Sequence, residues 1–337
     1  MGAATEYESG AAVLGGAPMN AGEYGAFLGA EYLDGYIPSG GGSVKVTVVG
    51  DDEVAIRLEA SLAAVAADRN TLFAAVSAET TKAHMIDQVF FAVSRQVDWT
   101  ALAAAVLAAA YDAIAVPSRD GRLSVAEVAA DHDLDPRELY RSVRRQLEHT
   151  LLADPTLARE MRRAVLRLAQ MHLLSGDVHP DEAQAVLDWL HGERVPVREL
   201  RAAMIYARIG RHNARSMLSS LGRLLLQIGQ GGLVVQLDLA RLAEGRRPAL
   251  GERTGVYYSK AAVLDAYELL RQLIDATDEL HGVLVIAVIP AELVTDEVRG
   301  LPAYGALQLR VADEVRDRRR PNPFASMVRL EVRLEAV

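Results

Sequence analysis

The sequence contains no cysteine, and this absence excludes disulfide bonds, thiol catalysis and cysteine-based zinc sites. None of the eight histidines follows another at His-x-x-x-His spacing, so we assign no metal site. No apolar run approaches the roughly 20 residues that a membrane-spanning helix needs. The first residues also lack the basic start and the apolar core of a signal peptide. We therefore expect a cytoplasmic protein with no membrane partner.

Basic residues are also fewer than acidic residues. The chain of 337 residues carries 36 Lys and Arg against 45 Asp and Glu, which gives a net charge of −9. This balance opposes wholesale binding to nucleic acids or membranes, although local basic surfaces remain able to bind them. Half of the residues are hydrophobic, so the chain is long and apolar enough for one large or two ordinary domains with a buried core.

The most informative stretch is a short apolar run, residues 44–49, which is rich in β-branched side chains. Glycines lie before this run and Gly50 follows it, as is typical of a buried strand. From residue 53 onward the apolar residues fall on one helical face, which predicts a helix. A strand, a glycine, a short turn and a helix form the layout in which a P-loop NTPase holds phosphate.

The residues that phosphate chemistry requires are missing from this layout. A P-loop has the pattern Gly-x-x-x-x-Gly-Lys-Ser/Thr. Counted from Gly50, the second glycine falls on Ala55, the lysine on Ile56 and the hydroxyl residue on Arg57. The acidic residues 51–53 also stand where phosphates would bind and repel them. Gly50 and Arg57 therefore outline a vestigial nucleotide site, in which Arg57 supplies the positive charge.

Residues 233–238 form another apolar run, which ends in Asp238. In P-loop enzymes such a strand ends in Asp-Glu, where the Asp orients the magnesium shell and the Glu activates the attacking water. Here Leu239 follows Asp238 and cannot act as a base. A lone aspartate at a strand end also serves as a turn or cap residue. We therefore assign Asp238 to the vestigial site and assign no catalytic residue and no cofactor; ATP with magnesium is what an intact site would hold.

The order of the expected elements predicts an α/β fold with an AAA+-like P-loop NTPase core and a mainly parallel sheet. Residues 1–22, rich in glycine and alanine, are expected to form a flexible tail. The core then comprises residues 23–84 and 229–337, and residues 85–228 form a large helical insertion. The alternating pattern of residues 328–334 predicts a terminal, half-exposed strand.

Four segments, in this order, resemble the ATP-binding proteins of bacterial BREX phage-defence systems. They are residues 31–38 (Glu-Tyr-Leu-Asp-Gly-Tyr-Ile-Pro), 189–193 (Trp-Leu-His-Gly-Glu), 231–238 (Gly-Gly-Leu-Val-Val-Gln-Leu-Asp) and 299–307 (Arg-Gly-Leu-Pro-Ala-Tyr-Gly-Ala-Leu). The resemblance covers residues 25–337 and implies an AAA+-like P-loop core with a helical insertion and an ATPase role in defence complexes. The chain departs from the family at the phosphate-loop Gly-Lys-Thr and at the glutamate expected after Asp238, so its nucleotide-binding motifs are degenerate.

Residues 123–147 match a helix-turn-helix pattern, with a turn near Asp133 and a second helix that begins by Pro136. The second helix carries four arginines on one face: Arg137, Arg141, Arg144 and Arg145. Such a face is expected of a recognition helix in a DNA major groove. The alternative is a packing module with a solvated basic face, since neighbouring Asp and Glu side chains weaken the attraction to DNA.

Arg310 lies on an expected helix near the end of the sequence. In AAA+ assemblies an arginine of one subunit reaches the γ-phosphate that its neighbour binds, and Arg310 is the candidate for this trans-acting role. The alternative is that Arg310 and the arginines of residues 316–320 form a solvated basic run ahead of a Pro-Asn-Pro turn.

Three functional hypotheses follow from these features. The first is a pseudo-ATPase of the BREX type, which acts as a regulatory or assembly subunit with a protein partner or as a homo-oligomer. The second is an active ATPase with a non-standard phosphate loop, which uses Arg57 and Asp238. The third is a DNA-binding regulator that acts through residues 123–147.

Overall fold

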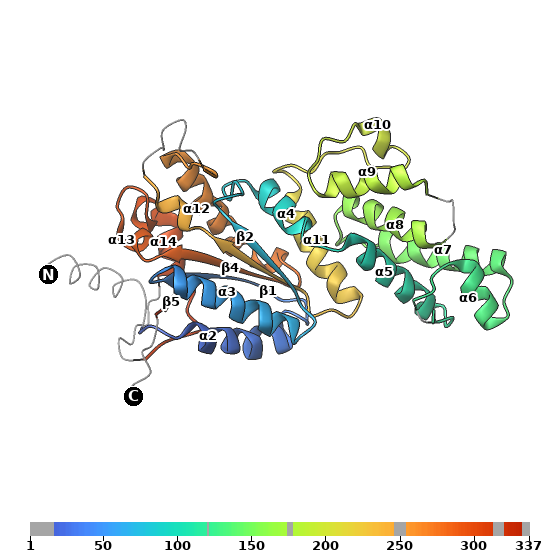
Figure 1. Ribbon diagram of the computed structural model, residues 1–337, viewed down its shortest axis with the longest axis horizontal. Coiled ribbons are helices and arrows are strands. Elements are labelled where there is room, and N and C mark those ends of the chain that lie inside the picture. The colour runs from blue at the N-terminus through green and yellow to red at the C-terminus, as the bar shows by residue number, and fades with distance from the viewer. Residues whose placement is uncertain (1–16, 120, 174–177, 246–253, 313–319, 332–337) are drawn as a thin grey trace. The chain divides into compact units, whose positions relative to one another are not determined.

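The computed structural model describes residues 17–119, 121–173, 178–245, 254–312 and 320–331 (Figure 1). The chain divides into two compact units, Met1–Val89 with Gln230–Val337, and Phe90–Gly229. We call the first the α/β unit and the second the helical unit. Among the described residues, no helix combines the length and the apolar character that crossing a membrane demands.

The α/β unit is built on five parallel strands in the order β2-β3-β4-β1-β5 (Figure 1). The strands are β1 (Gly42–Val49), β2 (Leu72–Ser77), β3 (Leu233–Asp238), β4 (Val283–Pro290) and β5 (Met327–Leu330). Burial is nearly continuous along β1, β3 and β4, because a parallel sheet is covered on both faces. The prediction of an α/β fold with a parallel sheet is confirmed, and the fold is consistent with a P-loop NTPase-like core.

The edge strand β5 follows the alternation expected for residues 328–334 as far as the structure describes them. Val328 and Leu330 are buried, whereas Arg329 and Glu331 are partly exposed. Met19 forms a bridge with Leu330 on the outer side of this strand. Residues 332–337 lie outside the described residues.

The N-terminal segment belongs to the core. Met19 and Ala21 are buried, and α2 (Ala21–Leu28) begins inside the stretch that was expected to be a tail. Asn20 caps this helix by accepting the backbone N–H of Gly22 at 2.8 Å. Residues 1–16 of the expected tail lie outside the described residues.

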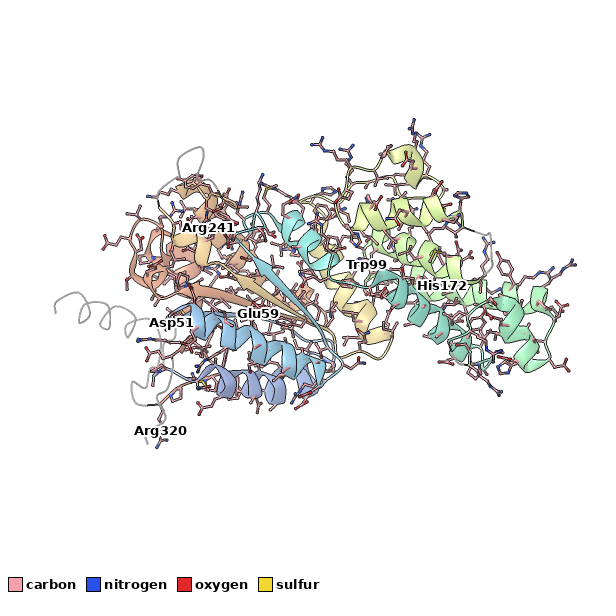
Figure 2. The ribbon with its side chains drawn as sticks, viewed as in Figure 1. Asp51, Glu59, Trp99, His172, Arg241 and Arg320 are labelled. Carbon is pink, nitrogen blue, oxygen red and sulfur yellow. The ribbon has the colours of Figure 1, made fainter. Side chains whose placement is uncertain are left out.

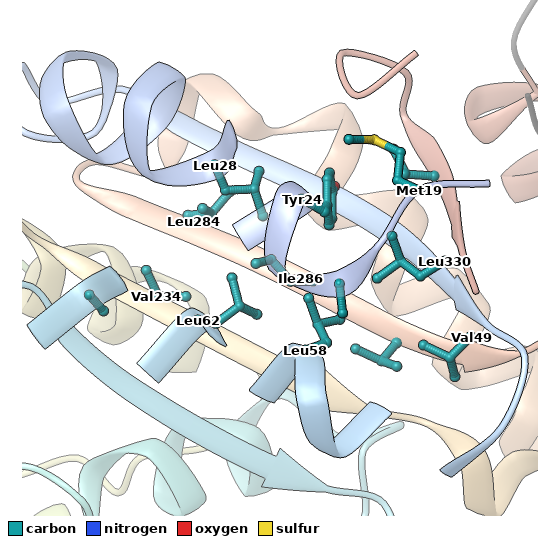
Figure 3. Packing of buried hydrophobic residues seen from close by; sticks show 14 of the residues in the cluster. Met19, Tyr24, Leu28, Val49, Leu58, Leu62, Val234, Leu284, Ile286 and Leu330 are labelled. Atoms are coloured by element: carbon teal, nitrogen blue, oxygen red, sulfur yellow. The ribbon is translucent and has the colours of Figure 1, made fainter. Parts of the chain in front are cut away.

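Two glycines let this segment pack closely against α3 (Asp52–Ala67). A Cβ atom at Gly25 would lie 2.1 Å from Ser61 Oγ, and one at Gly29, in the π-helix η1 (Gly29–Tyr36), would lie 2.6 Å from Val65 Cγ1. The two layers bury one apolar cluster against the sheet, which includes Tyr24, Leu28, Leu58, Leu62, Val234, Leu284 and Ile286 (Figure 3). This cluster fixes α3, whose N-terminus follows β1 directly.

Further helices of the α/β unit follow β3 and β4. They are α12 (Lys260–Asp275), α13 (Glu292–Thr295) and α14 (Gly305–Val311), with the 3-10 turns η2 (Ala240–Ala243), η3 (Thr277–Glu279) and η4 (Leu301–Ala303). The buried Arg299 joins them: its guanidinium donates to the carbonyl oxygens of Leu242 and Tyr258, each at 2.9 Å, and its own carbonyl accepts the Tyr267 hydroxyl at 2.7 Å. Carbonyl dipoles therefore satisfy this buried charge.

The helical unit lies between β2 and β3 in the sequence. Its helices are α4 (Ile86–Ser94), which leads into the unit, α5 (Trp99–Ala113), α6 (Val125–His132), α7 (Pro136–Leu152), α8 (Arg159–Leu173), α9 (Pro180–Leu190), α10 (Val197–Leu200) and α11 (Ala214–Gln227). Both α5 and α7 pack against α8. The buried Trp99 anchors the start of α5, because its indole N–H donates to the Ser94 carbonyl at 3.0 Å.

Candidate functional site

A cavity of about 620 Å³ lies in the α/β unit at the carboxyl ends of four strands. Its walls include Val49 from β1, Ser77 from β2, Asp238 from β3 and Pro290 from β4. After β1 the chain continues to β2, which lies beyond β4 and β3 in the sheet. After the neighbouring strand β4 it continues to β5, which lies on the other side of β1. The connections that follow these two adjacent strands therefore run in opposite directions. Ligands of open α/β sheets bind at such a change of direction, outside the carboxyl ends of the strands. The cavity is therefore the candidate site, and it has the size of a small-molecule site.

The connection between β1 and α3 consists of Gly50 and Asp51 alone. The positions that a phosphate loop would occupy, residues 52–57, already form the first turns of α3. Asp51 caps this helix, since its Oδ1 accepts the backbone N–H of Val54 at 2.9 Å. The free N–H groups of a helix N-terminus attract anions, and here a carboxylate of the chain itself occupies that position.

Of the three residues predicted to form a vestigial nucleotide site, Asp238 lines the cavity, whereas Gly50 and Arg57 do not. The Arg57 side chain is 53% exposed, and its guanidinium pairs with Glu53, one helical turn earlier, at 2.5 Å. Helix α3 turns a different face to the cavity, the one that carries Asp52, Ala55, Ile56 and Glu59. The structure therefore does not bring Arg57 and Asp238 together.

Asp238 ties the ends of two neighbouring strands. Its Oδ2 accepts the hydroxyl of Ser77, the last residue of β2, at 3.2 Å, and its Oδ1 accepts the backbone N–H of Ala240 at 3.0 Å. Leu239 is buried, and its backbone N–H donates to the Val288 carbonyl at 2.8 Å. The position after Asp238 thus contributes to the core and offers no base to the cavity.

The cavity is strongly acidic. The acidic residues in its wall are Asp51, Asp52, Glu59, Glu79, Asp238, Glu244 and Glu292; Figure 2 shows Asp51 and Glu59 along α3. Arg241 also lines it, but its guanidinium pairs with Glu244 and donates to the carbonyls of Val256 at 3.2 Å and Thr254 at 2.6 Å. This charge repels polyphosphate. Over the parts of the chain that the structure describes, no three His, Asp or Glu side chains are grouped as a metal would require.

Gln236 is the buried polar side chain of the cavity, with 2% of its surface exposed. Its amide donates to Glu59 Oε2 at 3.3 Å. Its Oε1 is shielded from solvent and accepts no hydrogen bond from the described residues. Leaving a buried acceptor without a donor costs about 1–3 kcal/mol.

Gln236 and Glu59 were not among the predicted site residues, although the position of each is readable from the sequence. The period-two alternation of a strand puts Gln236 on the same face as Asp238. Helical spacing puts Glu59 seven residues after Asp52, on the same face of α3. What the sequence cannot show is that the two side chains meet, since 177 positions separate them.

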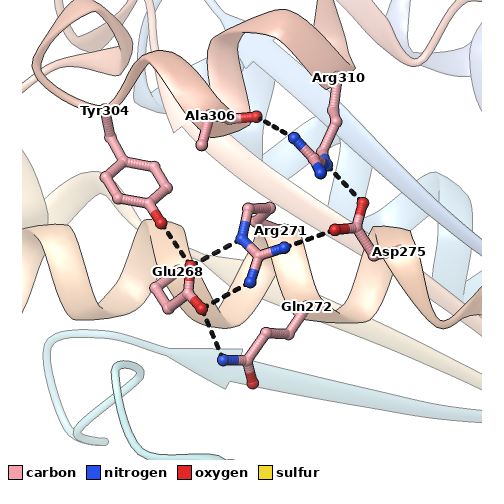
Figure 4. Close-up of polar contacts among 7 residues, drawn as sticks. All are labelled: Glu268, Arg271, Gln272, Asp275, Tyr304, Ala306 and Arg310. Atoms are coloured by element: carbon pink, nitrogen blue, oxygen red, sulfur yellow. Dashed lines mark hydrogen bonds and ion pairs between the residues drawn. The ribbon is translucent and has the colours of Figure 1, made fainter.

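Arg310, the candidate for a trans-acting arginine, is held within its own α/β unit (Figure 4). Its guanidinium pairs with Asp275 of α12 and donates to the Ala306 carbonyl at 2.8 Å. The hydrogen bond from Arg310 lowers the pKa of Asp275. Arg271 pairs with the same carboxylate at 2.5 Å and with Glu268 at 2.7 Å. To reach a neighbouring subunit, Arg310 would first have to leave this network.

In the helical unit, α6 and α7 meet at a short turn in which Asp133 adopts a left-handed conformation with φ of 52°. Asp135 caps α7, and its Oδ1 accepts the backbone N–H groups of Arg137 and Glu138 at 2.9 and 3.0 Å. All four predicted arginines of α7 are exposed. Arg144 is held by Glu148 at 2.9 Å, whereas Arg137, Arg141 and Arg145 have no ion pair with any described residue.

A family model described as BREX system ATP-binding protein BrxC/D matches residues 123–335. The matched residues begin at α6 and include β3, β4 and β5, whereas β1 and α3 precede them. The search of curated proteins and the search of solved structures each found no match.

Proposed function

The chain belongs to the BREX system ATP-binding protein BrxC/D family, and on that premise we propose that it is a pseudo-ATPase. In this proposal it keeps the P-loop-like framework but does not hydrolyse nucleotide. It serves a phage-defence complex as an assembly or regulatory subunit, and its partner is another protein or a second copy of the chain.

The observation that carries this proposal is the two-residue connection between β1 and α3. Phosphate binding at a P-loop relies on backbone N–H groups of a longer loop and on a lysine. Here α3 begins at Asp52, the Asp51 carboxylate caps it, and Ile56 takes the place of the lysine. Two further features support the same conclusion: the wall of the cavity is acidic, and Leu239, in the position of the catalytic glutamate, is buried.

Calorimetric titration with ATP and with ADP, each with and without magnesium, tests this proposal. We expect no saturable heat in any of the four titrations, because the cavity offers carboxylates where the phosphates would need donors. Phosphate release from ATP should likewise stay at the level of the buffer. Saturable heat with a micromolar dissociation constant would indicate a nucleotide receptor, and phosphate release above the level of the buffer would contradict the proposal.

An active ATPase with a non-standard phosphate loop is the alternative, and Asp238→Asn distinguishes it. Asparagine keeps an oxygen that can accept the Ala240 N–H, and its NH2 group can donate to the Ser77 hydroxyl in place of the second oxygen, but it loses the charge that would hold magnesium. A true enzyme would lose its turnover with this variant. Equal phosphate release from both proteins would exclude Asp238 as the residue that holds magnesium.

DNA binding through residues 123–147 is a second candidate function, favoured by the exposed arginines of α7. If DNA is the partner, Arg141→Glu combined with Arg145→Glu should abolish retention on duplex DNA at low salt. The unaltered chain should lose affinity steeply as salt rises, because each phosphate contact releases counterions. Arg201→Glu combined with Arg211→Glu is the matched control, since both residues are exposed in the same unit. Equal retention of the two double variants would exclude α7 as the interface.

A further inference from the structure

The helical unit contains a basic loop, residues 201–213, which joins α10 to α11. The loop carries Arg201, Arg208 and Arg211 and no acidic residue, although the chain as a whole has a net charge of −9. All three arginines are exposed, and none of them forms an ion pair with a residue that the structure describes. Positive charge concentrated in this way on an acidic chain attracts anionic partners.

Burial alternates along the basic loop. Ile205 and Ile209 are buried, whereas Met204, Tyr206 and Arg208 are exposed. The apolar side chains therefore anchor the loop to the helical unit, and the residues between them face solvent. Tyr206 is 59% exposed, although burial of its ring would stabilise the fold. The loop thus presents an aromatic ring among arginines on its solvent side.

Contacts with α8 and α9 hold this ring in place. The guanidinium of Arg163, on α8, donates to the Met204 carbonyl at 2.5 Å and lies 5.8 Å from the centre of the Tyr206 ring. The indole N–H of Trp189, on α9, donates to the Ala207 carbonyl at 3.1 Å. Met204 has a φ of 55°, in the left-handed region that residues with a side chain disfavour and that often occurs at binding sites. The backbone on both sides of Tyr206 is therefore fixed while the ring stays exposed.

From these features we infer that the basic loop binds single-stranded nucleic acid. Its arginines contact phosphates, and a base stacks on Tyr206, because proteins that bind single strands combine positive charge with exposed aromatic rings in this way. Duplex DNA offers the same phosphates but keeps its bases stacked on one another, so it cannot use the ring. An acidic protein would use only the arginines, and the exposed ring therefore favours a nucleic acid.

Acidic side chains limit the interface on one side. A hollow beside Ala202 is lined by three of them: Asp181, Glu182 and Glu199. Their carboxylates repel phosphate. The strand therefore runs over Tyr206 and away from this hollow, towards Arg208 and Arg211.

Fluorescence anisotropy of the full chain tests the inference with labelled oligothymidylate, labelled oligouridylate of the same length, and a labelled DNA duplex. We expect saturable binding of a single strand, which weakens steeply as salt rises, because phosphate contacts release counterions. A preference for one of the two single strands would identify DNA or RNA as the ligand, and equal affinities would indicate contacts with phosphates and bases alone. No binding of either single strand at low salt would overturn the inference.

Substitutions in the basic loop locate the binding. Tyr206→Ala should weaken single-strand binding about fivefold or more, whereas Tyr206→Phe, which keeps the ring, should bind as the unaltered chain does. Arg208→Glu combined with Arg211→Glu should weaken it about tenfold or more and reduce its dependence on salt. Arg141→Glu combined with Arg145→Glu is the matched control, because it makes the same change of charge at exposed residues of the same unit. Equal weakening by the two double variants, or an unchanged affinity of Tyr206→Ala, would overturn the inference.

The inference goes beyond the proposed function and can fail without it. The ATP titrations examine the cavity of the α/β unit, whereas the single strands examine the helical unit. Tyr206→Ala should keep the thermal midpoint of the unaltered chain, because most of the side chain is exposed. On duplex DNA the same variant should bind as the unaltered chain does, because the bases stay stacked. A loss of duplex binding as large as the loss of single-strand binding would contradict stacking on Tyr206.

Discussion

Replacing Leu58 by alanine is expected to lower the free energy of unfolding of the α/β unit by about 2–5 kcal/mol. Leu58 is fully buried in the middle of α3 and belongs to the cluster that joins α2, α3 and the sheet. Alanine would lose this apolar contact and leave a cavity beneath the helix that carries Asp51 and Glu59. Denaturant unfolding followed by far-ultraviolet circular dichroism measures the change.

The control for this prediction lies on the same helix. Ile56 is 69% exposed, and Ile56→Ala should change the free energy of unfolding by no more than about 0.5 kcal/mol. Both tryptophans of the chain, Trp99 and Trp189, lie in the helical unit. Tryptophan fluorescence therefore follows that unit, and its transition should stay in place if the effect of Leu58→Ala is confined to the α/β unit. Equal effects of the two substitutions would contradict the packing of α3.

The strands could be predicted from the sequence because their signals are local. Residues 44–49 and 233–238 are apolar runs between glycines or turn residues, and a parallel sheet buries such runs on both faces. The order of the strands could not be predicted in the same way. It depends on pairings such as β1 with β4, which join residues about 240 positions apart.

The N-terminal segment shows why composition misleads. The glycines and alanines of residues 1–22 are typical of a mobile tail, yet Ala21 already begins a buried helix. In the same helical segment Gly25 and Gly29 allow close approach to Ser61 and Val65. A glycine lowers the stability of an isolated helix, but it allows two helices to pack closely. Which effect dominates depends on the partner helix, which the local sequence does not reveal.

The candidate site was predicted in part. The strand ending in Asp238 and the glycine after β1 indicate the edge of the sheet at which the cavity lies. Counting along a phosphate-loop motif then selected Arg57, although Asp51 is a capping residue and its side chain starts a helix directly after Gly50. Reading the helix first would have selected Glu59 on the face of Asp52 in place of Arg57.

Lys45 places a charge inside the sheet of the same unit. It lies on β1, is 5% exposed, and its Nζ donates to the carbonyl oxygens of Phe324 at 2.7 Å and Ala325 at 3.1 Å. The Nζ also lies 5.2 Å from the centre of the Tyr32 ring. Burial lowers the pKa of Lys45 from 10.5 to about 8, because desolvation disfavours the charged form. These carbonyls belong to the segment that precedes β5, so the lysine joins the edge of the sheet to its centre.

The buried lysine predicts a dependence of stability on pH. Between pH 8 and 10.5 the unfolded chain holds a proton on Lys45 that the folded chain has released, so the free energy of unfolding rises with pH across this window. A pKa shift of this size is worth about 3 kcal/mol in full. The quantity to measure is the difference in free energy of unfolding between the unaltered chain and Lys45→Met, from pH 7 to 10. From pH 7 to pH 10 the free energy of unfolding of the unaltered chain should rise by about 2–3 kcal/mol relative to that of Lys45→Met. The tyrosines titrate in both proteins, so their contribution cancels in the difference.

The substitution also removes a donor from two carbonyls, which lowers stability at every pH and does not alter the slope. Lys260→Met at an exposed position is the matched control, and its difference from the unaltered chain should stay flat over the same range. A flat difference for Lys45→Met as well would mean that the lysine titrates in the folded chain as it does in the unfolded one. Its charge would then be solvated rather than buried beneath the segment before β5, and the attachment of that segment to β1 would rest on the strand pairing alone.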